Sequence, residues 1–290
     1  MQRDFVGYGK EGPAIKWPEK ARIAVNFMLN YEEGAELTAV NGDTHAEVDG
    51  GEFTPSLRPE GGRNLTMESL FEYGSRTGLW RLLRMFDKEQ IPLTLFLNGF
   101  ALRLNPQLCS YLGNSVHEIA GHGWRWIDYG AISKETEKEH IQQCIQTVTQ
   151  LTGKRPEGWL TSRRSEHTRK LLAEIGGFIY DSDSYADDCP YFDDKQLVIP
   201  CSLDCNDYRY STSPGFNCPE EFFNHLKNTF DCLYEEDRTG MMSIGIHPRF
   251  SGHPGRCVAL QQFVNYIKDL PEVWIARRID IAKYWQSMSQ

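Results

Sequence analysis

Short hydrophobic runs alternate with longer amphipathic stretches along this chain. Apolar runs bounded by turn-forming residues are typical of buried strands, and apolar positions three or four residues apart are typical of helices. We expect strands at 22–29, 93–97, 116–120, 157–161, 177–182, 197–200, 241–247 and 273–276. We expect helices at 69–89, 133–153, 165–177, 219–237 and 259–270.

This alternation predicts an α/β fold with a mainly parallel sheet. Seven or eight strands favour a (β/α) barrel, and because no linker-like segment divides the sequence, we expect a single domain over 1–290. The segment 37–64 is rich in Gly, Asp and Pro and has little periodicity. Since loops of this length are usually functional or mobile, we interpret it as a long loop and a candidate lid.

The composition narrows the classes of function. A net charge of −9 without a basic stripe argues against a nucleic-acid partner. No apolar stretch approaches the roughly 20 residues of a membrane span, and the N-terminus lacks the apolar core of a secretory signal, so we expect a cytoplasmic protein. The eight cysteines lack metal-type pairing, and we expect free thiols. A small neutral substrate fits these observations.

Polar and aromatic residues follow most of the expected strands. In a parallel barrel the active site gathers at the carboxyl ends of the strands. The segments at these ends are NYEEGAE (30–36), GHGWRW (121–126), TSRRS (161–165), YDSDSYADD (180–188), LDCNDYR (203–209) and HPRFSGHPGR (247–256). The sequence therefore predicts a candidate site at this end of the barrel.

Glu32 is the candidate general base. On a regular strand Glu32 and Glu33 would point to opposite faces, but Gly34 suggests a turn that relaxes this limit. Burial would raise the pKa of Glu32 and strengthen it as a base. The alternative is that both carboxylates are solvated charges of a loop.

His122 and His247 are the candidate histidines. His122 lies between two glycines, and the position one helical turn further on holds Trp126, which argues against a two-histidine zinc site. A hydrogen-bonded core histidine is the alternative. His247 ends an apolar run and is a candidate proton donor or acceptor, with a structural role equally open.

Further polar and aromatic residues could bind the substrate. Arg163, near the start of an expected helix, could bind a carboxylate or a polarised carbonyl, although surface solvation is the alternative. Tryptophans could form the wall of a pocket for a flat ring or could belong to the core. The candidate substrate-binding residues are Tyr31, Glu33, Trp124, Trp126, Trp159 and Arg163.

Taken in order, RDFVGYG, NYEEGAE, HEIAGHGWRWIDYG, GGFIYDSDSYADD, MMSIGIH and HPGR resemble the polysaccharide deacetylase superfamily, and specifically its branch of metal-independent allantoinases and cyclic imide hydrolases. The resemblance covers nearly the whole chain and implies an irregular (β/α) barrel. Deacetylases of the superfamily carry paired aspartates after strand one and an H-x-x-x-H metal pair after strand three. Here these places hold Glu32 with Glu33 and His122 with Trp126.

The resemblance also implies roles. Glu32 takes the place of the catalytic base and His247 that of the catalytic histidine, while His122 is a former metal ligand that binds or polarises the substrate. No cofactor is expected; a divalent metal such as zinc, if bound, would have Glu33 and His122 as ligands. The resemblance further implies a homo-oligomer, a tetramer.

The chain departs from the allantoinase pattern beside the expected pocket. It has GWLTSR at 158–163 in place of G-W-Y-T-G-R, and HPRFSGHPGR in place of H-C-R-L-x-G-R-P-G-R. The arginine that deacetylases carry after strand four is replaced by Leu160, with Arg163 as the nearest substitute. We therefore expect a hydrolase that opens a cyclic ureide such as allantoin or a smaller cyclic imide such as succinimide or maleimide. The alternatives are a metal-dependent N-deacetylase of a chitin-like sugar and a non-catalytic binding protein.

Overall fold

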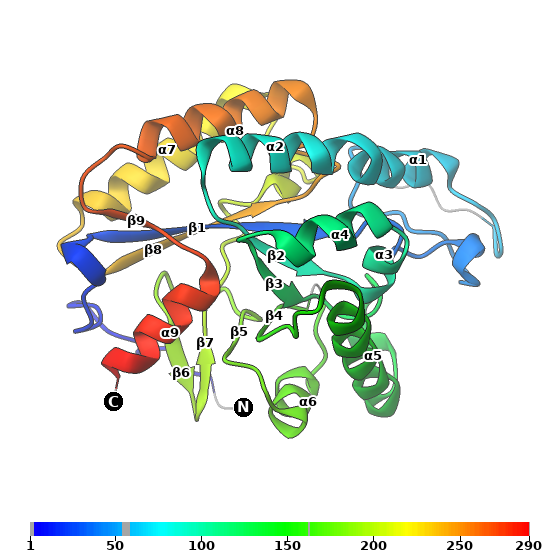
Figure 1. Cartoon of the computed structure of the whole chain (residues 1–290), viewed down its shortest axis with the longest axis horizontal. Coiled ribbons are helices and arrows are strands. Elements are labelled where there is room, and N and C mark those ends of the chain that lie inside the picture. The colour runs from blue at the N-terminus through cyan, green and yellow to red at the C-terminus, as the bar shows by residue number, and fades with distance from the viewer. Residues whose placement is uncertain (1–2, 54–58, 162, 290) are drawn as a thin grey trace.

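A twisted, mainly parallel sheet runs through the molecule (Figure 1), and the computed structural model describes residues 3–53, 59–161 and 163–289. The strands are β1 (Ile23–Tyr31), β2 (Thr94–Leu97), β3 (Glu118–Gly121), β4 (Gly158–Trp159), β5 (Tyr180–Asp181), β6 (Tyr191–Asp193), β7 (Gln196–Val198), β8 (Gly240–Ile246) and β9 (Val273–Ile275). Their order is β6-β7-β5-β4-β3-β2-β1-β8, and β9 also pairs with β1. Only β6 runs antiparallel to its described neighbour, β7.

Helices cover the sheet. The α-helices are α1 (Leu65–Tyr73), α2 (Leu79–Glu89), α3 (Gly99–Arg103), α4 (Pro106–Asn114), α5 (Lys134–Thr152), α6 (Thr168–Ile175), α7 (Pro219–Glu235), α8 (Pro254–Ile267) and α9 (Arg278–Met288). Short turns of other helix types are η1 (Pro18–Lys20), η2 (Ala39–Asn41), η3 (Gly74–Gly78), η4 (Tyr129–Ala131) and η5 (Asp207–Ser211). Figure 1 shows α2, α7 and α8 on one side of β1 and β8, and α9 with β6 and β7 on the other.

The strand β1 is buried along its whole length because both of its faces are covered. Val25 and Phe27 belong to the larger hydrophobic cluster, which includes residues of α2, α7 and α8. Ala24 and Met28 belong to a second cluster, which includes Trp285 of α9. The burial of β1 on both faces thus places the residues that follow it, beginning with Glu32, deep inside the molecule.

The helix expected at 69–89 is interrupted by the π-type turn η3, whose glycines touch the loop after β8. A Cβ atom on Gly78 would lie 2.1 Å from the carbonyl oxygen of Pro248, and one on Gly74 would lie 2.5 Å from Oε1 of Glu33. Only glycine fits at either position. The missing side chains let this helix approach the loop that carries His247.

The predicted irregular (β/α) barrel is confirmed as an open half-barrel of mostly parallel strands. All eight expected strands are present, although β4 and β5 have only two residues each. An isolated parallel bridge between Asn206 and Gly245 brings the segment after β7 towards β8. The sequence did not reveal β6, which forms an antiparallel hairpin with β7, nor the helices α3, α4 and α9.

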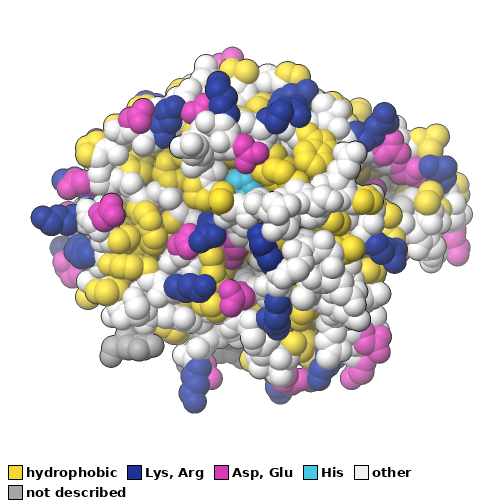
Figure 2. All heavy atoms as spheres, in the orientation of Figure 1, with side chains coloured by type: hydrophobic (Ala, Val, Ile, Leu, Met, Phe, Trp, Pro, Cys, Tyr) yellow, Lys and Arg dark blue, Asp and Glu magenta, His cyan; other side chains and the backbone are white. Residues whose placement is uncertain are grey.

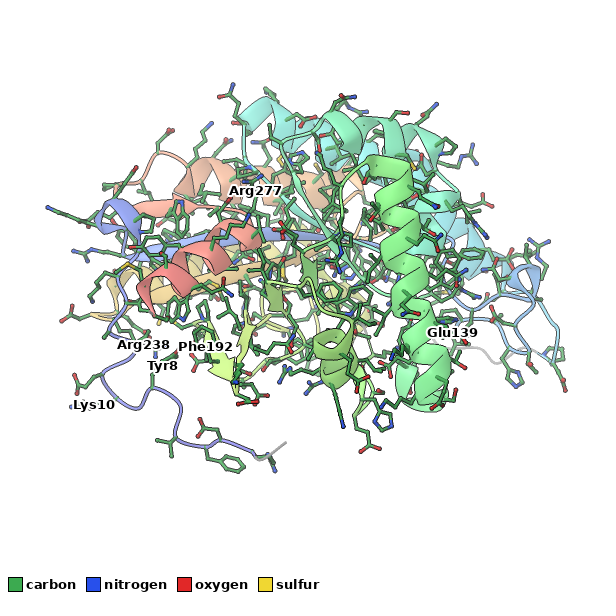
Figure 3. All side chains as sticks on the ribbon, turned by 60° about the horizontal axis from the view of Figure 1, so that its bottom comes forward. Tyr8, Lys10, Glu139, Phe192, Arg238 and Arg277 are labelled. Carbon is green, nitrogen blue, oxygen red and sulfur yellow. The ribbon has the colours of Figure 1, made fainter. Side chains whose placement is uncertain are left out.

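The N-terminal segment is attached to the hairpin side of the molecule. The hydroxyl group of Tyr8 donates a hydrogen bond to the carbonyl of Pro190, and Figure 3 shows Tyr8 at the end of the molecule where Phe192 lies. The face drawn in Figure 2 carries Lys and Arg side chains interspersed with Asp and Glu. All eight cysteines are free thiols, as predicted. Within the described ranges, no helix combines the length and apolarity needed to cross a membrane.

Candidate active site

Glu32, at the carboxyl end of β1, is the centre of a buried group of charged side chains, and only 2% of it is exposed. Its Oε1 atom lies 3.1 Å from Nε2 of His122 and 3.6 Å from Nε2 of His247, and its Oε2 atom lies 2.8 Å from Nη2 of Arg249. Burial alone would raise the pKa of this carboxyl. The positive charge of Arg249 and the contacts with both histidines outweigh burial, and the pKa lies well below its ordinary value.

His247 follows β8 and is oriented by Asp207, a buried residue of η5. The ring Nδ1 of His247 donates to Oδ1 of Asp207 at 2.6 Å, and the backbone N–H of His247 donates to Oδ2 at 2.8 Å. Burial alone would lower the pKa of His247, but the charges of Glu32 and Asp207 raise it to about 9. The ring therefore carries two protons at neutral pH, and its Nε2 is directed towards Glu32.

Asn30 completes the surroundings of His247. Its side-chain amide lies 3.1 Å from Nε2 of the ring. The amide atom that faces the ring is the nitrogen Nδ2, which donates to Nε2 when that atom carries no proton. When His247 carries both ring protons, the amide has to turn over so that its oxygen accepts from Nε2. In the orientation shown, the amide oxygen has no hydrogen-bond partner among the described residues, so nothing there opposes the turn.

His122 connects Glu32 to the end of β4. Its Nδ1 atom lies 2.7 Å from the carbonyl oxygen of Leu160, and since a carbonyl can only accept, Nδ1 carries the proton. Its Nε2 atom faces Glu32, and the ring is 1% exposed. His122 is thus a buried, hydrogen-bonded histidine, which was the alternative considered from the sequence. One of its two partners, however, is the candidate catalytic carboxylate of Glu32.

Arg249 is fully buried between aromatic rings beside Glu32. Its guanidinium carbon lies 4.5 Å from the ring centre of Phe71, 5.0 Å from that of Phe250 and 5.2 Å from that of Trp126. Such contacts stabilise a cation that water does not reach. Sequence reasoning missed Arg249, although its position two residues after His247, at a strand end, is the signal that could have found it.

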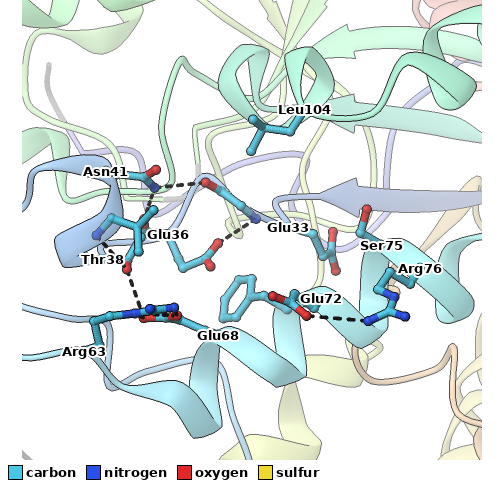
Figure 4. Close-up of a pocket in the computed structure, with 13 residues that line it drawn as sticks. Glu33, Glu36, Thr38, Asn41, Arg63, Glu68, Glu72, Ser75, Arg76 and Leu104 are labelled. Carbon is cyan, nitrogen blue, oxygen red and sulfur yellow. Dashed lines mark hydrogen bonds and ion pairs between the residues drawn. The ribbon is translucent and has the colours of Figure 1, made fainter.

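Glu33 faces a cleft of about 320 Å³ that adjoins the buried group (Figure 4). Its Oε2 atom accepts the backbone N–H of Glu32 at 3.0 Å, and burial raises its pKa to about 7 against the opposing charge of Arg249. Phe71 contributes to the same cleft and also contacts Arg249. The cleft is lined by Glu33, Gly34, Glu36, Thr38, Val40, Asn41, Arg63, Glu68, Phe71, Glu72, Ser75, Arg76 and Leu104.

Arg163 and Trp126 lie together beneath the long loop. The Arg163 guanidinium lies 4.5 Å from the ring centre of Trp126 and forms ion pairs with Glu47 at 3.8 Å and Asp49 at 3.5 Å. Trp126 is 3% exposed and contacts Arg249 with the same indole. The guanidinium beside Glu32 is therefore that of Arg249, whereas Arg163 binds the loop.

The other candidate substrate-binding residues lie in packed surroundings. The hydroxyl of Tyr31 lies 2.7 Å from that of Ser75, and burial raises the pKa of Tyr31. Trp124 packs edge-on against Phe100 of α3. Trp159 covers the end of β3. The structure therefore surrounds Glu32 with His122, His247 and Arg249, while these three aromatic residues contact the core.

The donor set around Glu32 does not fit a divalent cation. Glu33 has one oxygen on a backbone N–H and the other 3.8 Å from Nη1 of Arg249. Both nitrogens of His122 are engaged, and Trp126 fills the place of a second histidine. A buried guanidinium next to both carboxylates supplies the positive charge that a metal would otherwise supply.

A different group in the described residues has metal-type side chains. Asp204, Cys205 and His225 bring one potential ligand atom each within 4.8 Å of one another. Asp204, however, pairs with His225 at 2.7 Å and with Arg209 at 3.0 Å, and burial raises the pKa of Cys205 to about 11. These ion pairs account for the cluster without a metal.

Comparison with known proteins places this geometry in a family. The polysaccharide deacetylase model matches residues 63–176. A Schizosaccharomyces pombe protein assigned to the polysaccharide deacetylases is 36% identical over 312 residues, which cover 98% of this chain and 97% of that protein.

Two crystal structures superpose on almost the whole chain. They are those of PuuE allantoinase and of a probable polysaccharide deacetylase from Pseudomonas aeruginosa PAO1. Each has 45% sequence identity and a TM-score of 0.96, and each match covers 99% of this chain and 98% of the other. The chain belongs to the polysaccharide deacetylase superfamily, in the branch that contains PuuE allantoinase.

Proposed function

We propose that this protein is a hydrolase that opens the C–N bond of a small cyclic amide without a metal ion. The observation that carries the proposal is the contact of one oxygen of Glu32 with Nε2 of both His122 and His247. An ionised carboxylate and a protonated imidazole lie side by side, which is the pairing that general base and general acid catalysis requires. The similarity to an allantoinase supports the choice of a cyclic amide.

In the first step Glu32 accepts a proton from water while the water oxygen attacks a ring carbonyl carbon. The carbonyl oxygen takes the negative charge of the resulting tetrahedral intermediate. Once Glu32 has taken up the proton, Nε2 of His122 is released from it and would donate a hydrogen bond to this oxyanion. The low pKa of Glu32 keeps it ionised at neutral pH, and it also makes the carboxylate a weaker base than the raised pKa expected from burial.

In the second step the C–N bond breaks and the ring nitrogen takes a proton from Nε2 of His247. The carbonyl carbon becomes a carboxylic acid, and the nitrogen becomes an amide or urea N–H. The raised pKa of His247 keeps this proton available at neutral pH, and Asp207 stabilises the ring while it is charged. The deprotonated His247 then takes back the proton held by Glu32.

The substrate is tested with a hydrolysis panel on chelator-treated protein, with and without added zinc. The panel contains allantoin, hydantoin, dihydrouracil, succinimide, maleimide and an acetylated chito-oligomer. We expect one cyclic amide to be opened at the same rate in both conditions. Zinc-dependent release of acetate from the sugar would instead establish the deacetylase alternative, and no turnover of any compound would favour a non-catalytic binding protein.

A further inference from the structure

The segment 43–52 lies over the buried group and is held there by arginine side chains. The arginines come from three parts of the chain, and together they bind several residues of the segment. The contacts are Arg125 with Asp43 at 2.5 Å, Arg163 with Glu47 at 3.8 Å and Asp49 at 3.5 Å, Arg249 with the carbonyl of Gly50 at 2.9 Å, and Arg256 with Glu52 at 2.7 Å. The segment is therefore attached at several points and has no strand or α-helix of its own.

Gly50 makes the closest approach to the buried group. Its backbone is left-handed, with φ +77°, and a Cβ atom there would lie 2.8 Å from Cη2 of Trp126 and 3.2 Å from Nη2 of Arg249. Any other residue would push the segment away from both side chains. Trp126, at the place of a deacetylase metal ligand, is therefore the surface on which the segment rests.

Arg249 joins this segment to Glu32. Its Nε–H donates to the carbonyl of Gly50 at 2.9 Å, and its Nη2 lies 2.8 Å from Oε2 of Glu32. The guanidinium is rigid and planar, so a movement at Nε is transmitted to Nη2. Packing against Phe71 and Phe250 leaves little room for other movements.

The contact with Glu32 depends on this attachment. Nη2 of Arg249 lies 2.8 Å from Oε2 of Glu32, and Nη1 has no hydrogen-bond partner among the described residues. The Nε–H bond to Gly50 is therefore the directed contact that fixes the plane of the guanidinium. Without the segment in place, that plane would lose its fixed orientation.

We propose that Arg249 is a positioning residue that couples the docking of segment 43–52 to the orientation of Glu32, so that this segment is a lid whose closure completes the catalytic site. The inference rests on the catalytic role proposed for Glu32. The mechanism places substrate binding before closure, because the docked segment and the aromatic side chains leave the carboxylate only 2% exposed.

The test compares Gly50→Ala with Gly61→Ala. Gly61 is also left-handed, with φ +69°, but no atom lies within 4 Å of its virtual Cβ. Both variants carry similar backbone strain, and only Gly50→Ala collides with Trp126 and Arg249. We expect Gly50→Ala to lower kcat on the best cyclic amide by about tenfold to a hundredfold, since small misplacements at a catalytic centre have effects of that size. We expect Gly61→Ala to stay within about threefold of the parent protein.

Arg249→Lys shows whether the effect passes through Arg249. Lysine retains the charge but cannot contact Gly50 and Glu32 with one rigid group. The coupling predicts that adding Gly50→Ala to Arg249→Lys lowers kcat by much less than it does in the parent protein. In an Arg163→Ala background the Gly50→Ala effect should keep its full size. If Gly50→Ala lowers kcat by the same factor in the parent protein and in the Arg249→Lys variant, the proposal is overturned.

Two readouts separate this inference from the proposed function. Hydrogen exchange of segment 43–52 reports docking, and the imidazole NMR signals of His122 and His247 report the environment of Glu32. If no cyclic amide is turned over, the proposed function fails, yet Gly50→Ala should still move both imidazole signals and Gly61→Ala should not. Faster exchange in the Gly50→Ala segment with unchanged imidazole signals would overturn the coupling itself.

Discussion

Asp207 accepts two hydrogen bonds from His247, one from the ring Nδ1 at 2.6 Å and one from the backbone N–H at 2.8 Å. The same carboxylate also accepts the backbone N–H of Ser251 at 3.1 Å. The ring orientation and the loop after β8 are thus fixed together. The Nε2 atom of His247, the proposed proton donor, faces Glu32 as a consequence.

The first prediction concerns the pH dependence of activity. His247 is the proposed acid, and its pKa is raised to about 9 because Glu32 and Asp207 outweigh the effect of burial. We expect kcat/KM to fall above about pH 9, where the ring loses its second proton. Asp207→Asn should move this alkaline limb to lower pH by about one unit or more, because one of the two stabilising charges is gone. Rate profiles from pH 6 to 10 measure the shift.

The same pKa predicts the direction of a stability change. A histidine whose pKa is raised on folding stabilises the protein fully below its unfolded pKa of about 6.5 and loses that contribution as the pH rises through about 9. The gap in unfolding free energy between the parent protein and His247→Asn should therefore shrink between pH 6.5 and 9.5. A constant gap across this range would contradict the raised pKa.

The third prediction concerns Glu33, whose raised pKa also makes stability fall as the pH rises. Burial raises its pKa from 4.5 to about 7, so the folded protein holds this proton more tightly than the unfolded chain. Stability is therefore lost as the pH rises from 4.5 to 7, by up to about 3 kcal/mol. Glu33→Gln does not titrate, and its stability relative to the parent protein should improve between pH 5 and pH 8. Urea unfolding at both pH values tests this, and a pH-independent difference would refute it.

The fourth prediction concerns Trp126, which stands where the deacetylases carry the second histidine of their metal pair. Trp126→His restores an H-x-x-x-H spacing with His122, but Arg249 remains beside both carboxylates. We expect no stoichiometric zinc binding, together with a loss of about 3 kcal/mol of stability, since the indole packs against Phe71. Calorimetric titration with zinc and thermal unfolding measure these effects. Tight binding of one equivalent would show that the aromatic residue alone excludes the metal.

Much of the fold could be predicted because β1 and β8 are mainly apolar and the long helices have a clear amphipathic period. The weaker elements depend on tertiary contacts that no local pattern records. The helix at 69–89 contains a π-type turn because Gly74 and Gly78 must approach the loop after β8. The hairpin strand β6 has only three residues, all partly or fully exposed, so it is too short to show the alternation that marks a strand.

The candidate site was predictable where residues follow long strands. Glu32 and His247 directly follow β1 and β8. Because these two strands are parallel neighbours, both residues lie at the same end of the sheet. Asp207 and Arg249 were not predicted as site residues, because the direction of a side chain outside regular strands and helices cannot be deduced from sequence spacing. Arg163 was considered beside the substrate, but the acidic residues of the loop attract it instead. The expected rise in the pKa of Glu32 followed from burial alone. The pKa is lowered instead because Arg249, which was not predicted, lies beside the carboxylate.

The central claim is that Glu32, and no metal ion, activates the attacking water. Its most direct test is kcat of Glu32→Gln against the parent protein on the best cyclic amide, both treated with chelator, with Glu33→Gln as the matched control. The account predicts a loss of about 10²- to 10⁴-fold for Glu32→Gln and a much smaller change for Glu33→Gln. Full activity of Glu32→Gln, or activity of the parent protein that returns only with added zinc, would contradict it.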